Sequence, residues 1–75
     1  MFNVGDRIFI LEEYDTGLPG SKKLKPGTYI VQDFRKSVIT DKLMVYVIRR
    51  EKKGAKHEYV YHQEWLESRA FTERD

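Results

Sequence analysis

A chain of 75 residues is the size of one small domain, and without cysteine it has no disulfides or thiolate metal sites. Its 40% hydrophobic content, including five tyrosines and four phenylalanines, is too high for a disordered segment and indicates a packed core. The net charge of +2 is unevenly spread along the chain. Residues 21–56 hold eleven Lys or Arg against three acids, which gives +8. Residues 1–20 hold one base against four acids, and residues 57–75 hold two against five, so each of these segments carries −3.

The first half of the chain predicts two strands. Arg7–Leu11 is a β-branched and aromatic run that follows a glycine, which is typical of a strand. Residues 13–27 hold so many prolines and glycines that a helix or a central strand is excluded there. Thr28–Phe34 predicts the second strand, and a polar connector is expected from Arg35 to Lys42.

The second half predicts two or three more strands. Leu43–Ile48 is apolar on both faces, as in a strand buried on two sides. Lys52–Lys56 forms the next turn, where Gly54 is available for a positive φ angle, and His57–His62 is the fourth strand. Gln63–Glu67 indicates one helical turn.

The last residues fit either a fifth strand around Ala70–Thr72, which we prefer, or a continued helix. Short strands joined by mostly short connections are typical of a small antiparallel barrel or sandwich. We expect a closed barrel, because strands that are apolar on both faces need cover on both sides. The predicted fold class is therefore all-β: one domain over residues 1–75, a small antiparallel barrel of about five strands with one short helical turn near the C-terminus.

Three stretches carry a resemblance to a known class of folds. They are Asn3–Ile8 at the first strand, Pro26–Ile30 at the second, and Tyr61–Leu66 where a helical turn precedes the last strand. This order resembles the small SH3-like barrels that include KOW and Tudor modules. The resemblance implies binding of DNA, RNA, ribosomal surfaces, modified tails or other proteins.

The signature of peptide-binding SH3 domains, Ala-Leu-Tyr-Asp-Tyr, is not matched. The nearest stretch is Leu11–Asp15, and the single Trp65 follows the fourth strand instead of preceding the third. Recognition of proline-rich peptides is therefore not implied.

Patterns for catalysis and for metal binding are weak. Residues 17–22 lack the Gly-Lys-Ser/Thr order of a phosphate loop. His57 and His62 are five residues apart in a strand, so they point to opposite faces, and two ligands do not fill a tetrahedral site. The serines have no spacing that marks a nucleophile with its base. We expect no catalytic residue, no metal and no cofactor.

The fourth strand carries two rows of side chains, one on each face, and the row of tyrosines has two interpretations. Tyr59 and Tyr61 share a face that Tyr46 of the neighbouring strand could join. Exposed, this row would stack bases or cover a partner surface, and buried it would be core. On the other face Glu58, Val60 and His62 predict a partly exposed row.

The basic residues are the strongest functional signal. They cluster at three connections, where lysine-rich loops also serve simply to keep small β-proteins soluble. The three clusters are Lys22, Lys23 and Lys25; Arg35, Lys36 and Lys42; and Arg49, Arg50, Lys52, Lys53 and Lys56. If the strands alternate as simple hairpins, the first and third clusters lie at the same end of the sheet. If the first loop folds back instead, the first cluster lies beside the second.

We therefore expect a non-catalytic module that binds DNA or RNA with low sequence specificity. One alternative is a protein-interaction adaptor or a small regulator or inhibitor, of the kind encoded by phages or mobile elements, that docks on an acidic protein surface. Another is a subunit of a larger assembly. The expected binding residues are Lys22, Lys23, Lys25, Arg35, Lys36, Arg49, Arg50, Lys52, Lys53, Lys56, Tyr59 and Tyr61.

No apolar run approaches the roughly 18 residues of a membrane span, and the first residues do not resemble a secretory signal. The sequence thus predicts a soluble cytoplasmic protein without a membrane partner.

Overall fold

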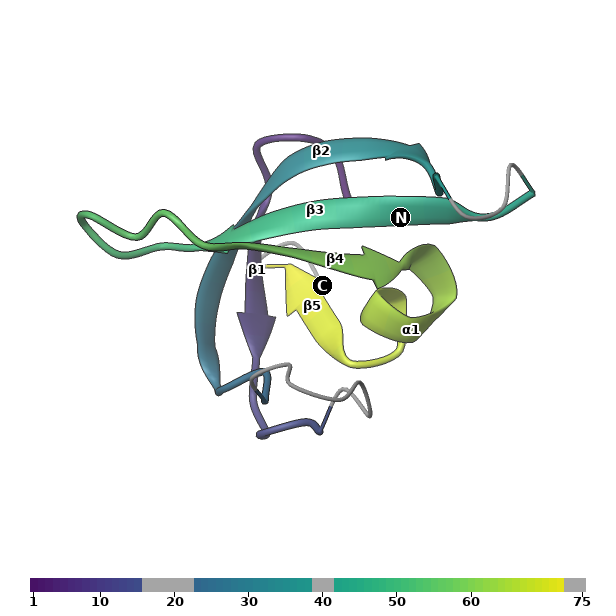
Figure 1. Cartoon of the computed structure of the whole chain (residues 1–75). Helices are drawn as coiled ribbons and strands as arrows, with labels where there is room; N and C mark the ends of the chain where they lie inside the picture. The colour runs from purple at the N-terminus through teal and green to yellow at the C-terminus, as the bar shows by residue number, and fades with distance from the viewer. Residues whose placement is uncertain (16–22, 39–41, 73–75) are drawn as a thin grey trace.

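The computed structural model describes residues 1–15, 23–38 and 42–72, which are built mainly of strands (Figure 1). All of these strands pair antiparallel in one sheet of order β4-β3-β2-β1-β5. The elements are β1 (Arg7–Ile10), β2 (Gly27–Lys36), β3 (Met44–Arg50), β4 (Glu58–His62), α1 (Gln63–Glu67) and β5 (Ala70–Thr72). The all-β class, the five strands and the helical turn before the last strand are confirmed.

The longest strand, β2, joins the two halves of the sheet. Residues 27–30 pair with β1, whereas residues 29–36 pair with β3. The register with β3 shifts between Val31 and Asp33, and such a bulge bends a strand and increases its twist. The sheet consequently curves around one interior (Figure 1).

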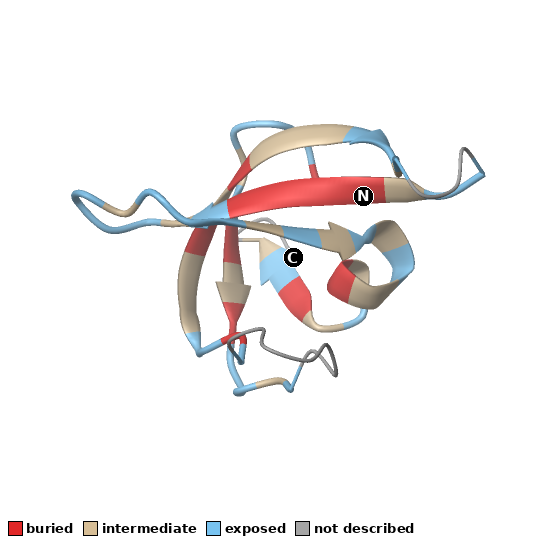
Figure 2. Cartoon of the chain, viewed as in Figure 1, coloured by how far each residue is buried: buried red, intermediate tan, exposed pale blue. Residues whose placement is uncertain are grey.

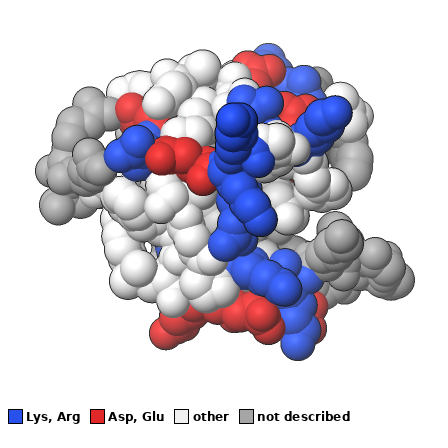
Figure 3. All heavy atoms as spheres, turned by 90° about the vertical axis from the view of Figure 1, so that its left-hand side faces the viewer, with Lys and Arg blue, Asp and Glu red and all other residues white. Residues whose placement is uncertain are grey.

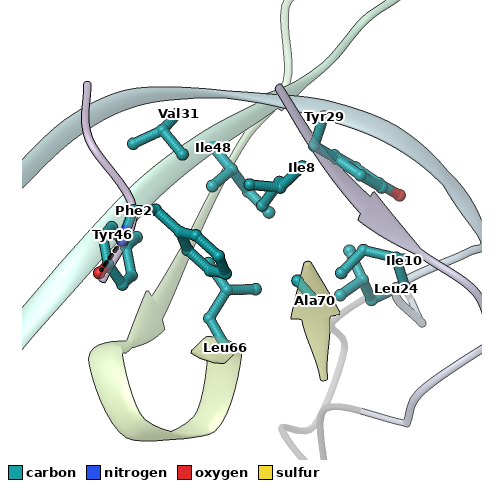
Figure 4. Close-up of a cluster of buried hydrophobic side chains, with 10 residues drawn as sticks. All are labelled: Phe2, Ile8, Ile10, Leu24, Tyr29, Val31, Tyr46, Ile48, Leu66 and Ala70. Atoms are coloured by element: carbon teal, nitrogen blue, oxygen red, sulfur yellow. Dashed lines mark hydrogen bonds between the residues drawn. The ribbon is translucent and has the colours of Figure 1, made fainter. Parts of the chain in front are cut away.

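The core lies inside this curve, where alternate side chains of the strands point. Tyr29, Tyr46 and Ile48 have no exposed surface at all, and a fully buried side chain of this kind contributes about 1.5–3 kcal/mol. The cluster consists of Phe2, Ile8, Ile10, Leu24, Tyr29, Val31, Tyr46, Ile48, Leu66 and Ala70 (Figures 2 and 4). On the other face of β3, Val45 and Val47 are buried too, which confirms that this strand is covered on both sides.

The sheet is not closed into a barrel, so this part of the prediction is wrong. β4 and β5 are the two edges of the sheet, and no pairing joins them in the ranges that the structure describes. The chain between them forms α1 and a turn, and β5 is only three residues long, which limits the pairing that it could form. Side chains from outside the sheet complete the interior instead, with Leu66 coming from α1 and Phe2 from the N-terminal segment (Figure 4).

A hydrogen-bond network ties the N-terminal segment and α1 to β3. The Tyr46 hydroxyl accepts a bond of 3.0 Å from the backbone N–H of Phe2 (Figure 4). It also donates a hydrogen bond to the Glu67 carboxylate. The Gln63 amide donates to the same carboxylate oxygen at 3.0 Å. The Tyr46 hydroxyl thus connects β3 to the N-terminal segment and to α1.

This network shifts the acidity of both of its titratable groups. Burial raises the pKa of Tyr46 to about 12, and the hydrogen bond to Glu67 adds to this. Burial also raises the pKa of Glu67, but the hydrogen bonds from Tyr46 and Gln63 outweigh it and the net pKa is lowered.

Two strands run further than the sequence indicated. The connector expected at Arg35 begins later, because Arg35 and Lys36 continue β2 by pairing with Val45 and Met44 of β3. At its far end, β3 includes Arg49 and Arg50, which lie beyond the strand end expected at Ile48. A charged residue does not indicate the end of a strand when one face of that strand is exposed to solvent, because the charged side chain can point to that face.

Candidate functional site

The connection between β3 and β4 projects from the body of the protein (Figure 1). Residues 51–57 form its tip, in which Gly54 takes the expected positive φ, here 82°. The backbone N–H of Ala55 donates to the Lys52 carbonyl at 3.0 Å, which closes the turn. We use the name basic hairpin for the cationic residues of this projection: Arg49, Arg50, Lys52, Lys53 and Lys56.

Arg50 anchors the base of the hairpin. Its guanidinium donates to the Pro26 carbonyl at 3.0 Å and to the Tyr29 hydroxyl at 3.3 Å, and lies 5.6 Å from the centre of the Tyr29 ring. The Tyr29 hydroxyl in turn donates to the Lys25 carbonyl at 2.7 Å. Arg50 therefore fixes the end of the first long connection against the base of the hairpin.

This contact decides which basic clusters come together. Lys25 lies beside the basic hairpin, so the described end of the first long connection meets the third cluster, as alternating hairpins predicted. Arg35 and Lys36 pair with the opposite end of β3 and do not join them. Lys23 pairs with Glu13 at 3.8 Å, whereas Lys22 lies outside the described residues.

Within the described residues, most cations of the hairpin have no acidic partner. Of the two acids beside them, Glu51 is engaged by Arg7 of β1 at 2.6 Å, and Glu58 lies opposite Arg49 in β4 without an ion pair between the two. Among the described residues, no acid pairs with Arg49, Lys52, Lys53 or Lys56. Like charges held close together without acidic partners raise the local concentration of a polyanion.

The cationic side chains form a continuous surface. Figure 3 looks onto the hairpin side and shows Lys and Arg in an unbroken band, with acidic side chains at its margins. A shallow depression of about 750 Å³ lies within this region, lined by Ile30 and residues 49–56. The surface can hold an extended anion, whereas nothing in it encloses a small molecule.

Half-buried aromatic rings follow β4 and α1 next to the hairpin. Tyr59 and Tyr61 are nearly parallel, with centroids 6.3 Å apart, and Tyr61 stacks on Trp65 at 4.6 Å. The Arg69 guanidinium lies 4.4 Å from the centre of the Trp65 ring. We call Tyr59, Tyr61 and Trp65 the aromatic column.

The column corrects the interpretation of the tyrosine row. Tyr46 does face Tyr61 across the strands, but it is buried in the core. Tyr59 and Tyr61 are half-buried and already stack within the protein, so they do not offer free ring faces. Burial raises the pKa of Tyr61 to about 12, with a further increase from Tyr59 and Tyr29.

Sequence reasoning missed Arg69, which covers one side of the column. A usable signal was present, because Trp65 and Arg69 are four residues apart at the end of a helical turn, the spacing that brings side chains together. The role of Arg50 as an anchor had no such signal. Its partners are a carbonyl and a tyrosine more than twenty residues away.

The row predicted on the other face of β4 is confirmed, since Glu58, Val60 and His62 are all exposed. Within residues 1–15, 23–38 and 42–72, no three His, Asp or Glu side chains gather closely enough to hold a metal ion. In the same ranges no helix is both long and apolar enough to cross a bilayer. The absence of catalysis and of a cofactor, and the cytoplasmic location, stay predictions.

No protein-family model matches this chain, and neither a curated protein nor a solved structure matches it. The case for a function therefore comes from the chemistry of the basic hairpin.

Proposed function

We propose that the protein is a non-catalytic binding module that holds nucleic acid through the basic hairpin. The observation that carries this proposal is the set of cations without acidic partners in the described structure, Arg49, Lys52, Lys53 and Lys56, next to Lys25. Lys and Arg that contact phosphates displace counterions, which supplies affinity without reading sequence. Low sequence specificity follows, because α1 is only five residues long and lies at the other end of β4.

We further propose that the module is of the SH3-like kind. Supporting this are the five antiparallel strands and the helical turn placed directly before the last short strand. The open edge between β4 and β5 is a departure from a closed barrel, and small modules of this kind bind many classes of ligand. The fold class therefore does not indicate which ligand is bound, and the proposal of nucleic acid rests on the basic hairpin alone.

The salt dependence of binding tests the nucleic-acid function. With three to five phosphates neutralised, log K should fall with log salt concentration at a slope of about −3 to −4.5 on duplex DNA. The triple variant Lys52→Gln, Lys53→Gln, Lys56→Gln should flatten that slope by about 2 to 3 and weaken binding on the order of tenfold to hundredfold at 0.1 M salt. Fluorescence anisotropy with a labelled oligonucleotide measures both quantities.

A second triple variant is the matched control. Arg35→Gln, Lys36→Gln, Lys42→Gln removes the same charge at the opposite end of β3 and should change the affinity by less than threefold. Equal losses in the two variants would mean that net charge alone attracts the ligand. If the folded protein binds no nucleic acid at low salt, the proposal fails, and an acidic protein surface is the ligand that the hairpin then fits.

A further inference from the structure

The shape of the basic hairpin indicates which nucleic acid it fits, an inference that rests on the function proposed above. We propose that the hairpin inserts into the major groove of double-stranded DNA, with its cations contacting the phosphates on both sides of the groove. The argument uses three features: the thickness of the projection, the placement of its charges, and the state of the neighbouring aromatic rings.

The projection is only two strands wide. Arg49 of β3 faces Glu58 of β4, and beyond this pair the chain runs out into the tip (Figure 1). All residues of the tip are exposed except the half-exposed Ala55. At Gly54 no heavy atom lies within 4 Å of the place a Cβ would take, so the end of the projection is slim.

These dimensions select among the grooves of nucleic acids. Paired strands are about 4.8 Å apart, and a two-stranded ribbon fits the major groove of B-form DNA, about 12 Å wide. The minor groove, about 6 Å wide, is too narrow for a ribbon with its side chains. In an RNA duplex the major groove is deep and narrow, which excludes the same entry.

The charges lie on more than one side of the ribbon. Successive residues of a strand point to opposite faces, so Arg49 lies on the face opposite to Arg50, whose guanidinium is held by Pro26 and Tyr29 on the side of Lys25. Lys52, Lys53 and Lys56 follow around the tip, and Lys25 lies beside the base. In Figure 3 the band continues over many side chains, as expected for a surface that contacts more than one phosphate.

The aromatic column argues against a single strand as the ligand. Proteins that hold single strands stack bases on exposed aromatic faces. Here Tyr61 lies between Tyr59 and Trp65, whereas Trp65 lies between Tyr61 and the Arg69 guanidinium. Their contacts within the protein would have to open before a base could stack.

Anisotropy titrations with three probes test the proposal: a DNA duplex of 20 base pairs, the RNA duplex of the same sequence, and one of the DNA strands. At 0.1 M salt we expect the DNA duplex to bind at least tenfold more tightly than the other two. Bound protein should also protect guanine N7, a major-groove atom, from methylation by dimethyl sulfate. Tyr61→Leu, verified as folded by near-UV circular dichroism, should change duplex affinity by less than twofold.

Equal or tighter binding of the single strand or of the RNA duplex would overturn the major-groove inference but leave the proposed function standing. Unprotected guanines with a bound duplex would do the same. Loss of duplex binding in folded Tyr61→Leu would also overturn the inference, because it would show that the rings contact the ligand. Absence of binding to all three probes would overturn both proposals.

Discussion

Arg50 shows how one residue of a basic cluster differs in role from its neighbours. In the sequence it is one of five cations around a turn, but its guanidinium is held by the Pro26 carbonyl and the Tyr29 hydroxyl. A cation that already has such partners stabilises the site more than it contacts a ligand. Lys52, Lys53 and Lys56, whose side chains are exposed, are the ligand contacts that we propose.

Gly27 and Gly54 offer a matched test of that anchor. Both have positive φ, 151° and 82°, but a Cβ on Gly27 would lie 2.8 Å from the Arg50 guanidinium, whereas one on Gly54 would meet nothing. Gly54→Ala should cost about 1–2 kcal/mol for backbone strain alone. Gly27→Ala should cost about 1 kcal/mol more, because Arg50 must move and lose its hydrogen bonds. Urea unfolding measures both.

A double variant separates strain from displacement. If Arg50 is the neighbour that must move, Gly27→Ala should cost less in an Arg50→Ala background than in the native protein. Strict additivity of the two changes would contradict the proposed contact.

The Tyr46 hydroxyl provides the second prediction at the residue scale. Tyr46→Phe leaves the backbone N–H of Phe2 without its acceptor and removes a donor from Glu67, at an expected cost of about 1–3 kcal/mol. Tyr59→Phe is the control, because no described residue bonds to that hydroxyl, and it should stay within about 0.5 kcal/mol. Thermal or urea unfolding that ranks the two variants equally would contradict this role.

At the scale of elements, α1 replaces the backbone closure that β4 and β5 do not form. Leu66, with no exposed surface, is its contribution to the core. Leu66→Ala should cost about 2–5 kcal/mol through lost burial and the cavity left behind. Glu64→Ala on the exposed side of the same helix should be nearly neutral. A cost below 1 kcal/mol for Leu66→Ala, measured in urea, would mean that α1 does not close the core.

The elements differed in how far the sequence predicted them. β1, β4, α1 and β5 were placed to within a residue, because local apolar periodicity and turn residues mark them. The ends of β2 and β3 were not, since Lys36 and Arg49 are polar yet keep their strand pairing. Barrel closure depends on whether two edges far apart in sequence meet, and no local pattern carries that information.

At the scale of the whole molecule, titration of a few groups sets the pH range of stability. The pKa values of Tyr46 and Tyr61 are raised from 10.0 to about 12, so the folded state favours their neutral forms. Their contribution is complete below pH 10 and is lost as the pH rises toward 12. The pKa of Glu67 is lowered from 4.5, so its contribution is present above that value and is lost as the pH falls.

Urea midpoints measured across the pH scale should therefore form a plateau that falls on both sides. Tyr61→Phe should reduce the alkaline decline, because one of the ionising groups is gone. A midpoint that is unchanged up to pH 12 would contradict the burial of these hydroxyls.

The candidate site was predictable only in part at this scale. Charge alone found the basic residues, and the convergence of the first and third clusters was one of two alternatives that the sequence left open. The engagement of Glu51 by Arg7 and the stacking of Tyr61 on Trp65 depend on tertiary contacts. These contacts decide which cations and rings remain available, so composition could not select them.

None of the residues from Glu51 to His57 belongs to the core cluster, and the anchoring contacts of Arg50 end at the base of the projection. The fold therefore constrains the residues of the tip weakly, whereas the binding function that we propose would constrain them directly. Replacements of Lys52, Lys53 or Lys56 should be tolerated by the fold, as at other exposed loop ends, whereas Gly54 is required for its positive φ. The same scaffold could thus acquire a different ligand in evolution, or in the laboratory by grafting, without any change to the residues that make it fold.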